Sequence, residues 1–185
     1  MASVLPAFNS ERVLGDYVNE FYAPAARKGR ALAADGFAAA RELGLWKEKI
    51  RAAWPGVTLK QVGTPKTEIS FAERVTLEVE VALNGLAPRD VRVECQVRRV
   101  LGSELVLPVQ GYAENRRREQ GVSYLEGRAV LLEPFTPGDV DGAGNCRYRL
   151  ELEPPWAGTL EYEVRGVPDH AHLSHPYELG LMRRL

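Results

Sequence analysis

The sequence lacks several of the features that define common functional classes. It contains only two cysteines, Cys95 and Cys146, with no CxxC pair and no histidine at metal-ligand spacing from them, so we expect reduced thiols in a core. No stretch approaches the roughly 18 consecutive apolar residues of a membrane-spanning helix, and the N-terminus lacks a basic segment followed by an apolar core. We therefore expect a soluble cytoplasmic protein with no membrane partner.

An excess of charge of either sign is also missing. The 185 residues carry 24 basic and 25 acidic side chains, a formal net charge of -1. Such a balance creates no long-range field that would attract a polyanion, and we expect no nucleic-acid partner. With 45% hydrophobic residues, a chain of this length can bury one core and carry an appendage.

The first structured element that the sequence predicts is a helix over residues 9–24. Its apolar residues recur at i, i+1, i+4, i+5, i+8 and i+9, which places them on one broad helical face. We call this face the helix stripe, and it consists of Val13, Leu14, Tyr17, Val18, Phe21 and Tyr22. Most of the remaining chain has the pattern of strands and offers no obvious cover, so the stripe is predicted to be an interface.

A second helix is predicted over residues 30–53, separated from the first by Pro24 and Gly29 and ended by Pro55 and Gly56. Beyond residue 57 the hydrophobic period changes from 3.6 to 2, which is typical of half-buried strands. The predicted strands are residues 57–62, 75–83, 91–97, 104–110, 123–132, 145–152 and 159–167. They predict an antiparallel sandwich of immunoglobulin-like or fibronectin-like type, although the Cys-Trp-Cys order of immunoglobulin domains is missing.

The fold expected from these patterns is α+β. It has a two-helix arm (residues 1–56), a β-sandwich (57–168) and a C-terminal tail (169–185). The tail begins with all three histidines of the chain, His170, His172 and His175, whose spacing is compatible with a metal site but more typical of packing residues in a loop. Their role is left open. A Gly-rich segment at 139–145 carries two carboxylates, but it lacks the full calcium-loop pattern and is predicted to be a hairpin turn.

Catalytic chemistry is not indicated by any motif. No nucleophile and base can be paired with specificity, so we predict no catalytic, cofactor or metal residues. Exposed aromatic side chains could stack on sugar rings, and the candidates are Trp156, Tyr112 and Tyr124. Tyr162 alternates with Leu160 and Val164 and is predicted to face the core.

Residues 8–26 resemble a helix near the end of the catalytic region of bacterial α-glucan (maltodextrin/glycogen) phosphorylases, glycosyltransferase family 35. The family pattern there is F-N-x-x-R-M-V-x-x-Y-x-x-x-x-Y-x-P-A, and this chain has F-N-S-E-R-V-L-G-D-Y-V-N-E-F-Y-A-P-A. Residues 37–43 and 46–56 resemble the next helix in the shorter branch of the family, which also carries a C-terminal β-region. Residues 86–94 and 176–181 resemble parts of that region.

The resemblance implies a parent enzyme that cleaves α-1,4-glucan with phosphate to give glucose 1-phosphate, using pyridoxal phosphate on a lysine in a G-N-M-K context. That context is missing, because the only lysines are Lys28, Lys47, Lys49, Lys60 and Lys66. The resemblance thus implies a non-catalytic C-terminal portion that braces absent catalytic domains or associates with itself through the stripe. Two alternatives are a stand-alone sandwich that binds α-glucan and an interaction protein that pairs through its helical arm.

Overall fold

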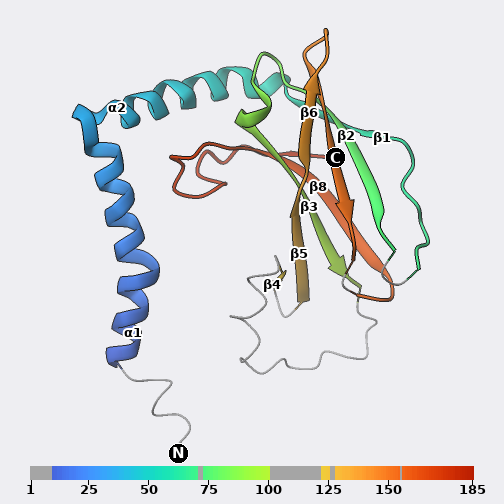
Figure 1. Ribbon diagram of the computed structural model, residues 1–185, viewed down its shortest axis with the longest axis horizontal. Coiled ribbons are helices and arrows are strands. Elements are labelled where there is room, and N and C mark those ends of the chain that lie inside the picture. Colours follow the sequence, from blue (N-terminus) through green and yellow to red (C-terminus); the bar gives the residue numbers. More distant parts are fainter. Residues whose placement is uncertain (1–9, 71–72, 101–121, 126–127, 155) are drawn as a thin grey trace, which may run out of the picture. The chain divides into compact units, whose positions relative to one another are not determined.

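The computed structural model describes residues 10–70, 73–100, 122–125, 128–154 and 156–185 (Figure 1). These residues form two compact units. The helical unit runs to Lys49 and includes Ala171–His175, while the β unit contains Ile50–His170 and Pro176–Leu185. The combination of helix and antiparallel sheet confirms the predicted α+β class.

The helical segment is continuous through Pro24. Helix α1 (Ser10–Tyr17) passes into a π-helical turn (Val18–Tyr22) and then into α2 (Ala23–Ala53). Pro24 is the second residue of α2 and comes directly after the π turn, where the helical hydrogen-bond pattern changes. The predicted separation into two helices at Pro24 and Gly29 is therefore wrong.

The interruption that does occur lies further along, inside α2. Asp35, Gly36 and Phe37 have φ angles of 49°, 61° and 66°, and Figure 1 shows the helix bending in this region. The Arg41 guanidinium donates to the Gly36 carbonyl oxygen at 2.6 Å and so bonds to the backbone at the kink. Helix α2 is followed by a 3-10 turn, Trp54–Gly56.

Two antiparallel sheets make up the β unit. The strands are β1 (Thr58–Val62), β2 (Val75–Ala82), β3 (Val91–Arg99), β4 (Val122–Leu125), β5 (Arg128–Pro134), β6 (Thr136–Val140), β7 (Asn145–Leu152), β8 (Leu160–Pro168) and β9 (Arg183–Arg184). One sheet has the order β1-β2-β7-β6 and the other β4-β5-β3-β8-β9. The immunoglobulin-like or fibronectin-like topology itself stays a prediction.

The predicted strands correspond to the observed ones with three differences. Residues 123–132 form parts of two strands, β4 and β5, which pair as a hairpin instead of continuing as one strand. Strand β6 was not predicted, because Pro137 and Gly138 disfavour a strand and are tolerated here at a sheet edge with a register shift. The short β9 was also missed, and the predicted strand 104–110 lies outside the described residues.

The core lies between the inner faces of the two sheets. Alternate residues of β2, β3 and β7 are buried, and they include Leu77, Val79, Val81, Val91, Val93, Cys95, Val97, Cys146, Tyr148, Leu150 and Leu152. The Tyr148 hydroxyl connects the sheets, because it lies 3.0 Å from the carbonyl oxygens of both Pro88 and Val91, between which its single proton is shared. Leu59 of β1 packs over Gly166 of β8. A Cβ added to Gly166 would lie 3.2 Å from the Leu59 side chain.

Both cysteines are buried free thiols, which confirms the prediction for them. Burial raises the pKa of Cys95 to about 12, and the Glu133 carboxylate adds to the shift. An unfolded cysteine titrates near about 8.5. The thiolate is therefore disfavoured only in the folded state, so stability is unaffected below about pH 8.5 and falls as the pH rises toward the folded pKa.

We expect the free energy of unfolding, measured with urea, to fall by roughly 2 kcal/mol between pH 7.5 and pH 10, since each pH unit between the two pKa values costs about 1.4 kcal/mol. A Cys95→Ala variant starts from lower stability but should lose less over this interval. Equal losses in the two proteins would contradict the assignment of the pH dependence to Cys95.

Candidate functional site

The helix stripe is exposed along its whole length. The exposed fractions of its side chains are 37% for Val13, 62% for Leu14, 51% for Tyr17, 43% for Val18, 59% for Phe21 and 64% for Tyr22. The rings of Tyr17 and Phe21 lie with their centroids 5.7 Å apart, so the stripe continues from α1 into the π turn. An apolar surface of this kind is typical of a face that packs against another protein surface.

The sequence offered two segments with the residue types of an ion site, the Gly-rich segment 139–145 and the histidines His170, His172 and His175. The segment 139–145 is the predicted hairpin turn between β6 and β7: Asp141 Oδ1 accepts hydrogen bonds from the amides of Ala143 at 2.9 Å and Asn145 at 2.8 Å. These bonds, chiefly that from Asn145, hold the pKa of Asp141 below its ordinary value. Within the part of the chain that the structure describes, no three His, Cys, Asp or Glu side chains are grouped to hold a metal ion.

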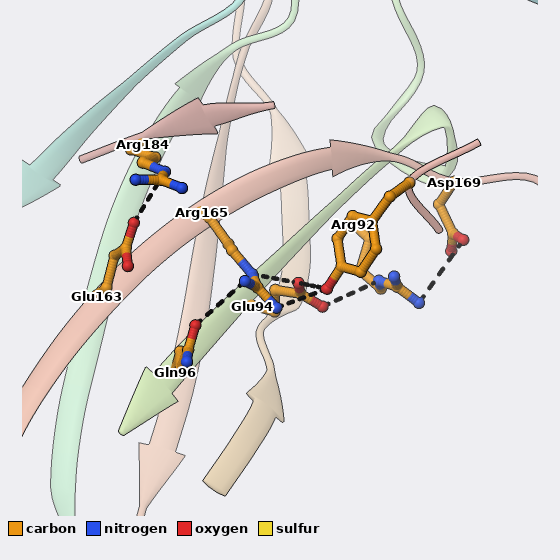
Figure 2. Close-up of polar contacts among 8 residues, drawn as sticks. Arg92, Glu94, Gln96, Glu163, Arg165, Asp169 and Arg184 are labelled. Carbon is orange, nitrogen blue, oxygen red and sulfur yellow. Dashed lines mark hydrogen bonds and ion pairs between the residues drawn. The ribbon is translucent and has the colours of Figure 1, made fainter. Parts of the chain in front are cut away.

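A polar cluster on the outer face of β3 and β8 was not predicted. Glu94 lies opposite Arg165 in the register of these strands, and Arg165 Nε donates to Glu94 Oε1 at 2.6 Å (Figure 2). Arg165 also donates to Gln96 Oε1 at 3.1 Å and to the Tyr177 hydroxyl at 2.6 Å, and that hydroxyl donates to Glu94 at 3.1 Å. We call these four residues the Glu94 cluster.

The charged pair at the centre of the Glu94 cluster is largely buried. The exposed fraction is 3% for the Glu94 side chain and 16% for that of Arg165. Burial first, and then the Glu94 charge, raise the pKa of Tyr177. The alternating sequence of β3 predicted a solvated outer face here. The sequence carries no signal that the C-terminal segment supplies Tyr177 to cover it.

A cleft opens at one end of the β unit. It has a volume of about 800 Å³, and its floor contains the buried residues Leu77, Val97 and Leu152. A smaller hollow of about 100 Å³ includes Trp156. The two hollows share Ile69, Pro154, Gly158 and Leu160, and we treat them together as the end cleft.

Of the aromatic residues proposed to stack on sugar rings, one lies at the end cleft. Trp156 lines the end cleft, and so does Tyr162, whose side chain is 42% exposed. The prediction that Tyr162 is a core residue is wrong, because the inner face that it shares with Val164 is open at this end of the sheet. Tyr112 lies outside the described residues, and of Tyr124, which belongs to β4, the structure describes the backbone alone.

The chain matches the family described as "Glycogen phosphorylase C-terminal domain" over residues 109–185. It is a homologue of the C-terminal region of glycogen and maltodextrin phosphorylases, glycosyltransferase family 35, which confirms the resemblance of its sequence motifs. Over 96% of its length it is 31% identical to the glycogen phosphorylase of Mycobacterium tuberculosis (strain ATCC 25618 / H37Rv). Over 98% it is 29% identical to the maltodextrin phosphorylase of Thermococcus litoralis.

The matched regions are only 18% and 19% of those two relatives, so the chain spans about a fifth of their length. No solved structure gives a significant match to the chain. Among the helices that the structure describes, none is long and apolar enough to cross a membrane. The parent family is that of glycogen phosphorylase, and nothing in the described residues indicates a site for pyridoxal phosphate.

Proposed function

We propose that this chain is the non-catalytic C-terminal portion of an α-glucan phosphorylase and that its helix stripe braces the catalytic region. The parent reaction is the phosphorolysis of α-1,4-glucan to glucose 1-phosphate, with pyridoxal phosphate held by residues outside this chain. The observation that carries the proposal is the row of exposed apolar side chains on a helix whose sequence matches relatives about five times longer. A face with this composition gains about 1.5–3 kcal/mol for each large side chain that becomes fully covered.

The test is binding in trans. The chain and the phosphorylase catalytic region that we propose it braces are produced separately and mixed, and their association is followed by analytical ultracentrifugation. Phe21→Asp should weaken the association at least tenfold, because a carboxylate would be desolvated in the interface. Phe37→Asp is the matched control, since Phe37 is equally exposed at 59% but lies outside the stripe.

Two outcomes would contradict the proposal. One is the absence of association between the two folded polypeptides. The other is an equal effect of both aspartate variants, which would show that the stripe has no special part in the contact. If the chain alone forms dimers that Phe21→Asp dissociates, while the catalytic region does not bind, the self-association alternative replaces bracing.

A further inference from the structure

We propose that the end cleft is a binding site for an α-glucan chain. The choice of an α-glucan among neutral ligands rests on the proposed function. The volume of about 800 Å³ lies within the range of about 300–1,000 Å³ that is usual for small-molecule sites. It lies between the two sheets at one end of their strands, since Val75 and Leu77 come from β2 and Leu160 and Tyr162 from β8.

The lining combines apolar surface, which suits the C–H faces of a sugar ring, with hydroxyl groups, which suit the hydroxyls of the sugar. Leu77, Val97 and Leu152 give an apolar floor, while Trp156 and Tyr162 add aromatic surface on which the C–H faces of a pyranose can pack. Hydroxyl groups are frequent around this floor. They belong to Thr64, Thr67, Thr159 and Tyr162.

Tyr162 can give a ligand a directed hydrogen bond. Its hydroxyl oxygen accepts from Gln61 Nε2 at 3.2 Å, and a phenol that accepts one bond still has its own proton to donate. A sugar hydroxyl is a suitable acceptor. A purely apolar ligand would leave this proton and the threonine hydroxyls without partners, which is costly once water is displaced.

The charges at the cleft also favour a neutral ligand. Lys66 Nζ lies 2.6 Å from Glu73 Oε1, so the cation at the rim is already compensated. Glu68 is the other charged residue of the described lining, and it is exposed. By contrast, a hollow of about 590 Å³ on the outer face of β6 and β7 is lined by charged residues and contains no aromatic residue within its described lining.

Gly158 lies between the two aromatic residues in the sequence and lines both hollows of the end cleft. Its φ is +103°, and an added Cβ would lie 3.7 Å from the Arg99 guanidinium. Side chains at such a φ are strained. Because both hollows are lined by Gly158 and Leu160, Trp156 and Tyr162 border adjoining parts of the end cleft, although the sequence separates them by five intervening residues.

Isothermal titration of the full chain with maltoheptaose tests the inference, and affinity electrophoresis in glycogen gels gives a second readout. We expect saturable binding that Trp156→Ala and Tyr162→Ala each weaken about tenfold, the equivalent of about 1.4 kcal/mol for one lost aromatic contact. Tyr162→Phe should have a smaller effect, because it keeps the ring. Tyr22→Ala, on the helix stripe, is the control and should bind as the parent chain does.

Thermal unfolding of each variant shows whether it is folded before its affinity is interpreted. Absence of maltoheptaose binding by the folded parent chain would overturn the inference, and so would binding that both cleft variants retain. Binding of cellohexaose with equal affinity would show that the site does not select α-glucan. The outcome is distinguishable from that of the bracing test, since a chain that docks on the catalytic region but ignores maltoheptaose refutes the cleft alone.

Discussion

Arg165→Met should lower the free energy of unfolding by about 3–5 kcal/mol, because it leaves the buried Glu94 carboxylate without its main counter-ion. The Glu94 side chain is 3% exposed, and Arg165 Nε lies 2.6 Å from Glu94 Oε1. The remaining cation near Glu94 is Arg92, whose Nε is 3.4 Å from Oε2 but does not form a hydrogen bond there. Arg92 can therefore compensate only partly.

Urea unfolding at pH 7 measures the effect, and Arg74→Met is the matched control. Arg74 pairs with Glu153 at 3.1 Å, but both side chains are at least half exposed, so its loss should cost less than about 1 kcal/mol. A double variant, Glu94→Gln with Arg165→Met, should recover part of the loss because it removes the buried charge. If the single Arg165 variant is as stable as the Arg74 variant, the Glu94 cluster does not hold the C-terminal segment on the sheet.

Arg183→Ala should destabilise the β unit by about 3 kcal/mol, since hydrogen bonds from a charged donor contribute about 1.5–3 kcal/mol each and are not additive. Arg183 donates to three carbonyl oxygens that follow helix α2. The acceptors are Val57 at 3.0 Å, Trp54 at 3.0 Å and Pro55 at 3.1 Å. Carbonyl groups at a helix end lack partners within the helix and benefit from a cation.

The neighbouring Arg184 provides the control for this variant. Its side chain is 68% exposed and pairs with Glu163 at 3.0 Å, so Arg184→Ala should cost less than about 1 kcal/mol. Hydrogen exchange adds a local readout, because the amide of Val57 donates to the Trp54 carbonyl and should lose protection in Arg183→Ala. Unchanged protection of that amide would contradict the capping role.

Local patterns were sufficient to predict most of the strands. The alternation in residues 145–152 corresponds to β7 residue for residue, because one side of that strand is core and the other is solvent. The same reasoning failed at Glu94 and Gln96, where a distant segment covers the polar side. Periodicity reports which side chains share a face, but it carries no information about what covers that face.

The helical prediction failed for a related reason. Pro24 and Gly29 are weak helix formers in isolation, yet the helix continues through both, with a π turn ahead of Pro24. Tyr162 is a further case in which periodicity did not reveal what covers a face of a strand. Its alternation with Val164 is correct, but the sequence does not reveal that the space between the sheets is open at that end.

The two buried thiols give the β unit a pair of internal reporters. Cys95 belongs to β3 in one sheet and Cys146 to β7 in the other, so each reacts with a disulfide reagent only when its own sheet opens. If the sheets separate as one cooperative event, both thiols become accessible in the same opening. Mass spectrometry of partly labelled protein would then distinguish a single unfolding unit from two without any engineered probe.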